Sequence, residues 1–410
     1  MPTPGGGNAF KRAQVRYRRQ ASAPDRVDDL DELIDFSKAA TSSSSSSSED
    51  VRIGPRAVVI PIPQESSATT TTNNNSNYDY DYYQGPLYTL RDVPDFLYAP
   101  QALSPALQRQ LSYAAVTRYC EAPHTTNIHN VPIKHDRGGE VFNAPGETMW
   151  KLWKQDNSSN NSNNKKTTKH YKSFQKLSWA TTGYHYDWTQ RSYDKTAHSP
   201  MPTLLHRVST LFALTALRYY HHPGTKPENP TNGSTSFQFT PSACIVNYYN
   251  PKSLMGGHRD DLELALDKPI VSLSLGRPAI FLLGGPTKDD APIRPILVRP
   301  GDVMMMGGDC RLNFHGMARL LPQRLPFGTG TAPWPEQQVS LESLVVSPND
   351  TTATTTTSGR EEPSWLLDIS EEEQAALQVY LSQHRININV RQVYPDGEND
   401  LESESLSSSC

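Results

Sequence analysis

The spacing of apolar side chains changes near the middle of the chain. Apolar residues recur at helical spacing through Leu205, Val208, Leu211 and Phe212, and this stripe predicts a helix with one buried face. From Ala243 onward the apolar runs are short, rich in β-branched and aromatic residues, and bounded by glycine or proline. Such runs predict strands, here over 244–249, 269–276, 279–285, 296–298 and 301–308. Many short strands joined by turns favour a sandwich or jelly roll over a parallel α/β sheet.

Further helix and strand signals flank this region. Ser104 followed by Pro105 is a typical N-cap with proline at the first helical position. Ser370 and Glu373 form a capping box in front of another helix. Residues 385–392 alternate polar and apolar side chains and predict the last strand. The predicted fold class is therefore mainly β with flanking helices (α+β).

Low-complexity segments interrupt this pattern. The runs of serine, threonine and asparagine lack the apolar side chains that join a core, and they lie at 41–48, 69–76, 157–168 and 349–358. We therefore expect 1–84 to be mostly disordered, apart from a helix-like stretch over 8–18. We expect one domain over 85–395, with insertions near 157–168 and 322–365, and a disordered acidic, serine-rich tail over 396–410.

Composition excludes several classes of protein. The chain has 410 residues and a net charge of -4, which is not the signature of a nucleic-acid binder as a whole. Its cysteines, Cys120, Cys244, Cys310 and Cys410, form no Cys-x-x-Cys pair. Their scatter argues against a zinc ribbon or a secreted disulfide framework and favours a reducing compartment. Because we find no apolar run of about 18 residues and no signal-peptide pattern, we expect no membrane association.

Basic side chains are nevertheless concentrated in two places. One cluster is formed by Lys11, Arg12, Arg16, Arg18 and Arg19, and the other by Lys165, Lys166, Lys169, Lys172 and Lys176. Such clusters are most often solvated surface, but beside an active site they become candidates for phosphate contact. We expect a nuclear or cytoplasmic protein, although the acid-free stretch from Lys11 to Arg19 is also compatible with mitochondrial import.

Two imidazoles and one carboxylate suggest a metal site. His258 and Asp260 lie two residues apart, so in an extended chain both side chains point to one face. His315 follows after further strands, and a jelly roll can return it to the same place. This ligand set holds non-haem Fe(II) and leaves positions open for O2 and a chelating 2-oxo acid. Taken alone, the motif is equally compatible with a His–Asp pair in a loop and a packed core histidine.

The sequence His258-Arg-Asp260 also imitates the catalytic loop of a protein kinase. A kinase requires asparagine five residues after the aspartate, and that position is Ala265. No Asp-Phe-Gly follows, and no glycine-rich phosphate loop precedes. The kinase interpretation therefore fails.

The last predicted strand carries a second set of polar side chains. The residues that share one face of this strand are Arg385, Asn387, Asn389 and Arg391. An ordinary amphipathic strand would show the same alternation. Two guanidiniums on one face also match a small dicarboxylate, because their planar forks pair bidentately with carboxylates. Asn247 and Tyr249, again two residues apart, add neutral donors from another strand.

Together these motifs resemble the AlkB family of Fe(II)- and 2-oxoglutarate-dependent dioxygenases, which remove alkyl groups from nucleic-acid bases. The resemblance runs in the family's order from Leu177 to Val393, interrupted by the insertion at 322–365. The motifs that carry it are Asn247-x-Tyr249, His258-x-Asp260, Pro269-Ile-Val-Ser-Leu-Ser-Leu-Gly276, Gly301-Asp-Val303, Gly307-Gly-x-x-Arg311-Leu-x-x-His315 and Arg385-x-Asn387-x-x-x-Arg391. Phe281-Leu-Leu-Gly-Gly285 and Thr182-Gly-Tyr-His-Tyr-Asp-Trp188 look closer to the eukaryotic AlkB homologue one subtype.

The resemblance implies a double-stranded β-helix (jelly roll) core and a role for each motif residue. The implied iron ligands are His258, Asp260 and His315. The implied contacts to 2-oxoglutarate are Arg385, Tyr249 and Asn387 at the distal carboxylate and Arg391 and Asn247 at the metal-bound end. The implied base-stacking residues, for which core packing is the alternative, are Trp179, Tyr184 and Tyr186.

The activity that the resemblance implies is oxidative demethylation of N-methyl adenine or cytosine in tRNA or DNA, for tRNA modification or DNA repair. The reaction consumes 2-oxoglutarate and O2 and releases succinate, CO2 and formaldehyde. A protein or histone demethylase with the same iron site and a non-catalytic nucleic-acid-binding module are the alternatives. We expect a monomer. Compared with the bacterial enzyme, Leu262 replaces a base-reading carboxylate and Met306 replaces a tryptophan, so base specificity stays open.

Overall fold

The computed structural model describes the central part of the chain and several segments outside it. The described residues are 7–19, 33–37, 51–52, 58–61, 82–128, 133–134, 140–141, 149–151, 153–154, 174, 176–187, 189–221, 237–322, 338–345 and 366–398. The low-complexity runs at 41–48, 69–76, 157–168 and 349–358 lie outside these residues. The same holds for most of the second basic cluster and for the tail beyond 398.

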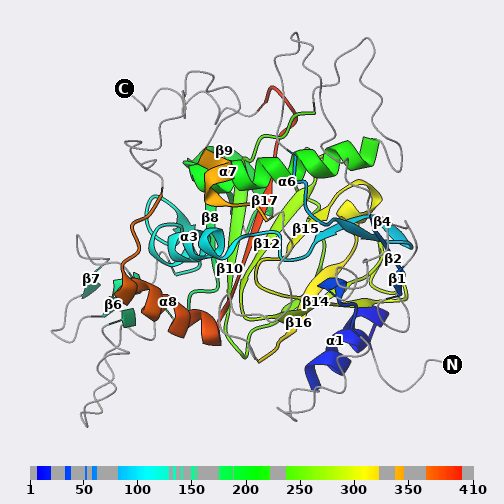
Figure 1. The fold of residues 1–410 in the computed structure, drawn as a ribbon, viewed down its shortest axis with the longest axis horizontal. Helices are drawn as coiled ribbons and strands as arrows, with labels where there is room; N and C mark the ends of the chain where they lie inside the picture. The colour runs from blue at the N-terminus through cyan, green and yellow to red at the C-terminus, as the bar shows by residue number, and fades with distance from the viewer. Residues whose placement is uncertain are drawn as a thin grey trace.

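A main sheet of eleven antiparallel strands forms the centre of the molecule (Figure 1). Its spatial order is β1 (Val51–Arg52), β2 (Val58–Pro61), β3 (Tyr88–Leu90), β4 (Val93–Ala99), β15 (Val303–Met306), β12 (Ile270–Gly276), β17 (Arg385–Arg391), β10 (Ala243–Tyr249), β8 (Trp179–Asp187) and β5 (Thr125–Thr126). Strand β9 (Ser192–Ser199) pairs with β8 as a hairpin. Each strand predicted from the sequence after Ala243 is present.

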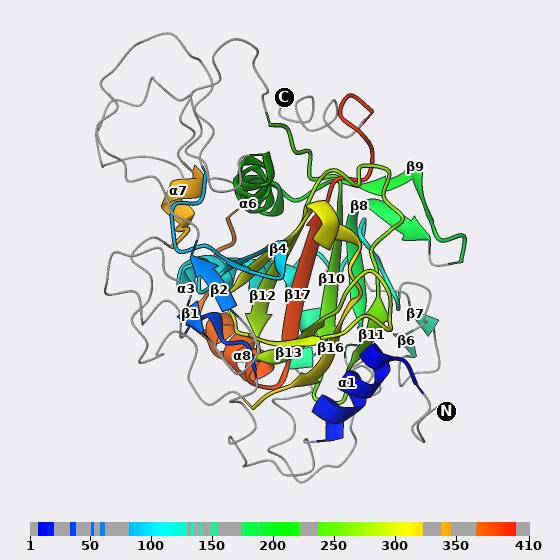
Figure 2. The same cartoon turned by 90° about the vertical axis from the view of Figure 1, so that its right-hand side faces the viewer.

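A second sheet of four strands completes a sandwich (Figure 2). Its order is β11 (Met255–His258), β16 (His315–Leu320), β13 (Ala279–Leu283) and β14 (Arg294–Val298). Phe96 and Met304 of the main sheet belong to the same buried cluster as Phe281 and Ile296 of the second sheet. Two antiparallel sheets that share one core are the arrangement of a jelly roll, so the predicted fold class is confirmed.

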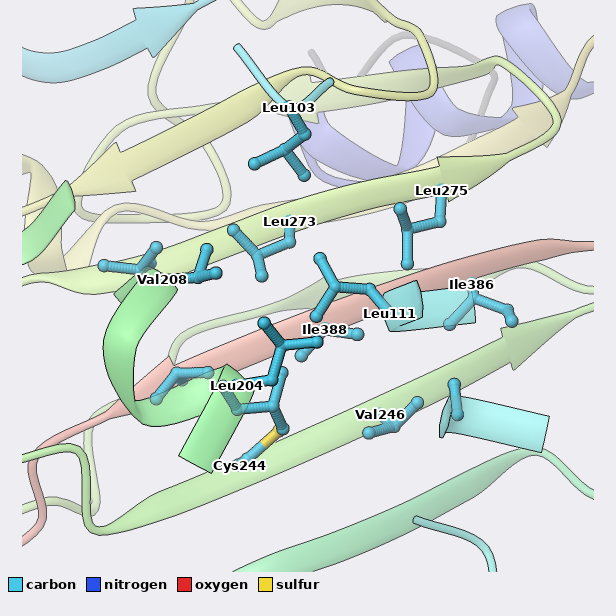
Figure 3. Packing of buried hydrophobic residues seen from close by; sticks show 14 of the residues in the cluster. Leu103, Leu111, Leu204, Val208, Cys244, Val246, Leu273, Leu275, Ile386 and Ile388 are labelled. Carbon is cyan, nitrogen blue, oxygen red and sulfur yellow. The ribbon is translucent and has the colours of Figure 1, made fainter. Parts of the chain in front are cut away.

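Helices cover the other face of the main sheet. They are α3 (Pro105–Thr117), α6 (Thr203–His221) and α8 (Glu371–Gln383), with the short α7 (Leu341–Val345) near α6. Figure 3 shows Leu111 and Leu204 of these helices packed against Val246, Leu273 and Ile388 of the sheet. The apolar side chains of β17 therefore face the helices, and its polar side chains face the second sheet. The polar side chains of β17 thus share one face, as the alternation over 385–392 predicts.

The predicted helix starts are confirmed with one difference. The Ser104 hydroxyl accepts from the amide of Leu107 at 3.2 Å, and that of Ser370 accepts from the amide of Glu373 at 3.3 Å. The Glu373 carboxylate instead accepts from the Trp150 indole at 2.6 Å. The capping box is thus formed on the serine side, and the acid serves to fasten the segment around Trp150 to α8.

Parts of the N-terminal region 1–84 and of the insertion at 322–365 pack against the core. Strands β1 and β2 extend the main sheet, and helix α1 (Ala9–Arg19) buries Phe10 against the second sheet. Within the insertion at 322–365, Val339 and Leu344 are buried in the main core. Short apolar stretches next to low-complexity runs supply these contacts, and α1 covers the helix-like stretch over 8–18 that the sequence predicts. Among the described helices, none is long and apolar enough to cross a bilayer.

Candidate metal centre and cosubstrate pocket

Antiparallel pairing of two short strands places the two candidate histidines side by side. His258 ends β11, His315 begins β16, and the two residues are direct partners in the register. Asp260 follows in the next loop and points back. Its Oδ1 lies 3.8 Å from Nε2 of His258, and its Oδ2 lies 3.9 Å from Nε2 of His315. One donor atom from each residue lies within 4.8 Å of the other two, so small side-chain rotations bring all three onto one ion.

Backbone carbonyls fix the orientation of both imidazoles. Nδ1 of His258 lies 3.0 Å from the carbonyl oxygen of Gly256, and Nδ1 of His315 lies 3.1 Å from that of Asn313. A carbonyl can only accept, so each ring donates from Nδ1 and leaves the lone pair of Nε2 toward Asp260. Orientation of a ligating histidine by a hydrogen bond from its other nitrogen is the usual arrangement in metal sites.

The electrostatic surroundings favour the protonation states that bind metal. Burial, followed by the neighbouring His258, lowers the pKa of His315 to about 4. Burial alone would raise the pKa of Asp260, but Arg391 and the two histidines outweigh it and lower that pKa below its usual range. A neutral imidazole and an ionised carboxylate at neutral pH are what a divalent cation requires.

Arg385 is fully buried on the same side of the main sheet. Its guanidinium donates to the Ser274 hydroxyl at 2.9 Å and to the Arg277 carbonyl at 3.2 Å, and its Nε has no partner. Among the described residues, no carboxylate pairs with Arg385, and burial lowers its pKa. A buried cation with only neutral acceptors is costly until an anion joins it, and a carboxylate fits that need.

A single cavity joins the metal triad to Arg385. Its lining consists of the triad, Arg385, Tyr249, Asn387, Asn389, Ser272, Met255, Ile270, Phe281, Met304, Met306, Gly316 and Met317. The donor set is thus a facial triad at one wall and a guanidinium with a phenol at another, and it fits Fe(II) together with 2-oxoglutarate.

Two of the residues expected to contact 2-oxoglutarate, Asn387 and Asn247, are not positioned to donate to it without rearrangement. Both amide hydrogens of Asn387 already donate, to the Ser272 hydroxyl at 2.9 Å and to the Leu273 carbonyl at 3.1 Å. A hydrogen bond from Asn387 to a carboxylate therefore requires exchange of one of these partners. Asn247 is paired in register with Asn387 and is 6% exposed, but it does not line the cavity.

Arg391 belongs to a buried ionic network that our sequence reasoning missed in part. Its guanidinium lies 3.4 Å from Oδ2 of Asp260 and 3.0 Å from the Glu263 carboxylate. Arg311 holds the other oxygen of Glu263 at 2.9 Å and donates to the backbone carbonyl of Asp260. Tyr193 of β9 donates to Glu263 at 2.9 Å. Arg311 lies within the Gly307 to His315 motif, but nothing in the sequence marks Glu263 or Tyr193.

The three aromatic residues expected to stack on a base lie on β8 but have different neighbours in the part of the chain that the structure describes. Tyr184 is 1% exposed and packs edge-on against Tyr394, with ring centroids 5.0 Å apart. In this structure Tyr184 therefore packs in the core, which is the alternative that the sequence left open for it. Trp179 lies opposite Asn247, and the ring of Tyr186 lies 5.3 Å from that of Tyr193.

Comparisons with known proteins cover this region of the chain. The family model described as the 2OG-Fe(II) oxygenase superfamily matches residues 148–391, which include the triad and both arginines. The Arabidopsis thaliana protein named DNA N(6)-methyladenine demethylase ALKBH1A is 29% identical over 325 residues, 75% of this chain and 78% of that protein. The human protein named nucleic acid dioxygenase ALKBH1 is 27% identical over 313 residues, 76% and 67% of the two chains. The Schizosaccharomyces pombe protein named tRNA demethylase abh1 is 31% identical over 164 residues, 39% and 48%.

Proposed function

Because the chain belongs to the 2OG-Fe(II) oxygenase superfamily, we propose that it oxidatively demethylates N-methylated adenine or cytosine in tRNA, DNA or both. Its metal is Fe(II), and 2-oxoglutarate and O2 are its cosubstrates. The names of the relatives support a nucleic-acid substrate, since they include a DNA demethylase and a tRNA demethylase. The products are formaldehyde, succinate and CO2.

One observation carries this function. The cavity beside the facial triad also contains a buried guanidinium that lacks a carboxylate partner among the described residues. A metal-binding protein without a cosubstrate would gain nothing from Arg385, whose burial is costly without an anion. The pair of features therefore supports turnover of a 2-oxo dicarboxylic acid.

Each residue has a defined task in this reaction. Bound Fe(II) supplies the redox chemistry that couples decarboxylation of 2-oxoglutarate to hydroxylation of the methyl group. His258, Asp260 and His315 would hold the ion on one face and leave the cavity side open. Arg385 binds the distal carboxylate and thereby orients the oxo acid. Apolar walls that include Phe281 and Met306 exclude water from the site.

The experiment that tests the function is a substrate panel. Purified chain, Fe(II) and 2-oxoglutarate are incubated with oligonucleotides and tRNA that carry 1-methyladenine, 3-methylcytosine or N6-methyladenine, and with methyl-lysine peptides. We expect formaldehyde and succinate in equal amounts with at least one nucleic acid and with no peptide. Turnover of peptides in preference to every nucleic acid would overturn the proposal.

We propose further that the chain acts as a monomer in the nucleus or cytoplasm. The exposed large apolar side chains among the described residues are few, namely Leu254, Val379 and the neighbouring Leu264 and Leu266. Such a surface does not favour a stable contact between copies. Sedimentation velocity should give the mass of one chain across the concentrations used for activity, and imaging of the tagged chain tests its location.

A further inference from the structure

Helix α1 is fixed next to a metal ligand by a close contact with glycines. Phe10 is 2% exposed and lies against Gly257, the residue before His258. A Cβ at Gly257 would lie 2.5 Å from the Phe10 ring, and one at Gly284 would lie 3.2 Å from it. A side chain at Gly257 would overlap the Phe10 ring, so glycine at this position allows the helix to sit this close to β11.

Further contacts hold α1 in register with the second sheet. The Gln14 side-chain amide donates to the Met255 carbonyl of β11 at 2.9 Å, and the Phe10 amide donates to the Lys288 carbonyl at 2.9 Å. Tyr17 joins Phe10 in a buried cluster with Ile280 and Leu282 of β13. The inner face of α1 therefore forms specific contacts with the second sheet. These contacts fix the rotation of the helix and so the direction of its outer face.

The outer face of α1 is strongly basic. Lys11, Arg12, Arg16 and Arg18 are exposed, and we call these four residues the α1 basic face. Among the described residues, no carboxylate forms an ion pair with Lys11, Arg12 or Arg18. The first turn of α1 contains no acidic residue, although the helix dipole favours acids there. The carboxylate at that end of α1 comes from another segment, since Asp289 accepts from the Ala9 amide at 3.4 Å.

Two further basic residues lie near Phe314, the residue before His315. Lys288, whose carbonyl holds Phe10, places its ammonium 5.2 Å from the centre of the Phe314 ring. Arg259, between His258 and Asp260 in the chain, lies at the same distance from that ring and also pairs with Asp261. The His258 side chain is 37% exposed, more than those of Asp260 and His315. Cationic groups thus border the more open side of the triad.

We propose that the α1 basic face binds the phosphodiester backbone of the nucleic acid whose base occupies the cavity. The inference rests on the function proposed above and adds where the polynucleotide lies. Nucleic acid is the partner because its regularly spaced negative charges complement a row of cations on one helix face. An apolar partner would not select this face, which offers only charged side chains.

A pair of matched variants tests the proposal. Lys11→Gln with Arg18→Gln removes two charges from the α1 basic face. Arg109→Gln with Arg118→Gln removes two from α3 and its C-cap residue, across the main sheet (Figure 1). Binding of a fluorescein-labelled single-stranded DNA is measured by anisotropy over a range of salt concentrations. Loss of two phosphate contacts should lower the slope of log Kd against log salt by about 1.4 and raise Kd roughly 10- to 30-fold near 0.1 M salt. The α3 variant should bind like the parent chain.

The outcomes separate this inference from the proposed function. An α1 variant that binds DNA with the parent's Kd and salt slope overturns the inference, as does an equal loss in the α3 variant. Affinity for 2-oxoglutarate and the thermal midpoint of both variants verify that the fold and the cosubstrate site are intact. A parent chain that binds DNA through α1 and demethylates neither the oligonucleotides nor the tRNA would contradict the proposed function alone.

Discussion

Arg385 is a buried cation that meets only neutral acceptors among the described residues. Replacement by methionine, of similar length, should therefore have opposite effects on stability and on cosubstrate binding. Without ligand, Arg385→Met should raise the free energy of unfolding by about 1–4 kcal/mol, because a costly buried charge is removed. The same change should remove about 2–4 kcal/mol of 2-oxoglutarate binding, a rise in KM on the order of 30-fold to 1000-fold. Urea denaturation and cosubstrate titration measure the two quantities.

A second arginine provides the control for that prediction. Arg299 forms a bidentate pair with Asp35, with both distances 2.6 Å. Arg299→Met should lower the free energy of unfolding, because it leaves the Asp35 carboxylate without its partner, and should leave the KM for 2-oxoglutarate unchanged. If both methionine variants shift stability in the same direction, Arg385 is not the uncompensated charge that we describe.

Adjacent aspartates allow a matched test of the metal triad. Asp260 points at both imidazoles, whereas Asp261 pairs with Arg259 at 3.0 Å. Asp260→Ala should abolish turnover and weaken binding of Fe(II), or of Mn(II) used as its substitute, because it removes the only anionic ligand. Asp261→Ala should keep metal affinity near that of the parent chain. Calorimetric titration with metal decides the matter, and normal metal binding by Asp260→Ala would contradict the assignment.

At the scale of elements, the β8–β9 hairpin is fastened to the metal site through Glu263. That carboxylate is 3% exposed and neutralises Arg311 and Arg391 while it accepts from Tyr193. Glu263→Gln should lower the free energy of unfolding by about 3–5 kcal/mol, because the buried Arg311 loses its carboxylate partner and Arg391 keeps only Asp260. Tyr193→Phe removes one hydrogen bond and should cost about 1 kcal/mol. Chemical denaturation of the two variants gives both values.

The test depends on whether Glu263→Gln loses more unfolding free energy than Tyr193→Phe does. A Glu263→Gln variant no less stable than Tyr193→Phe would show that Asp260 alone compensates Arg391. Tyr193→Phe should also raise the KM for the nucleic acid more than that for 2-oxoglutarate, since the hairpin carries Tyr186 beside Tyr193. Equal changes in both KM values would place the effect at the metal rather than at the hairpin.

These elements also show what could be predicted from the sequence. Alternation over 385–391 reveals which side chains share a face, because strand geometry has a period of two residues. The His258 and Asp260 spacing suggests a ligand pair by the same argument, although Asp260 lies in the loop after β11 and turns back toward the histidines. The counter-ion of Arg391 could not be inferred, since Glu263 reaches it only after the loop beyond Asp260 folds back. The sequence also left open whether Tyr184 stacks on a base or packs in the core, because local sequence does not state which side of a twisted hairpin becomes core.

At the scale of the whole molecule, the main sheet serves both stability and chemistry. Its helix-covered face holds the largest apolar cluster, and its other face carries Arg385, Asn387 and Tyr249 toward the second sheet. The strands that hold the cosubstrate residues are therefore central in the sheet and packed on both sides. Binding groups on such strands are held more rigidly than groups on loops.

The insertion at 322–365 should divide into a part that the core needs and a part that it does not. Residues 349–358 carry no apolar side chain larger than alanine. Deleting them should leave the free energy of unfolding within about 0.6 kcal/mol of the parent value, because closure entropy changes slowly with loop length. Residues 338–345 contain Val339 and Leu344, which are 5% and 6% exposed, and the Val339 amide donates to the Ala102 carbonyl at 2.8 Å.

Deleting 338–345 should therefore be costly. Each buried aliphatic side chain contributes about 1.5–3 kcal/mol, so the loss of Val339 and Leu344 should lower the free energy of unfolding by roughly 3–6 kcal/mol. The deletion also leaves the Ala102 carbonyl without its partner, which adds to the cost. Both deletions shorten the same insertion by a similar length. The difference between their denaturation midpoints therefore measures the effect of losing the buried side chains, separately from the effect of shortening the chain. Equal midpoints would mean that Val339 and Leu344 add nothing to the core they touch.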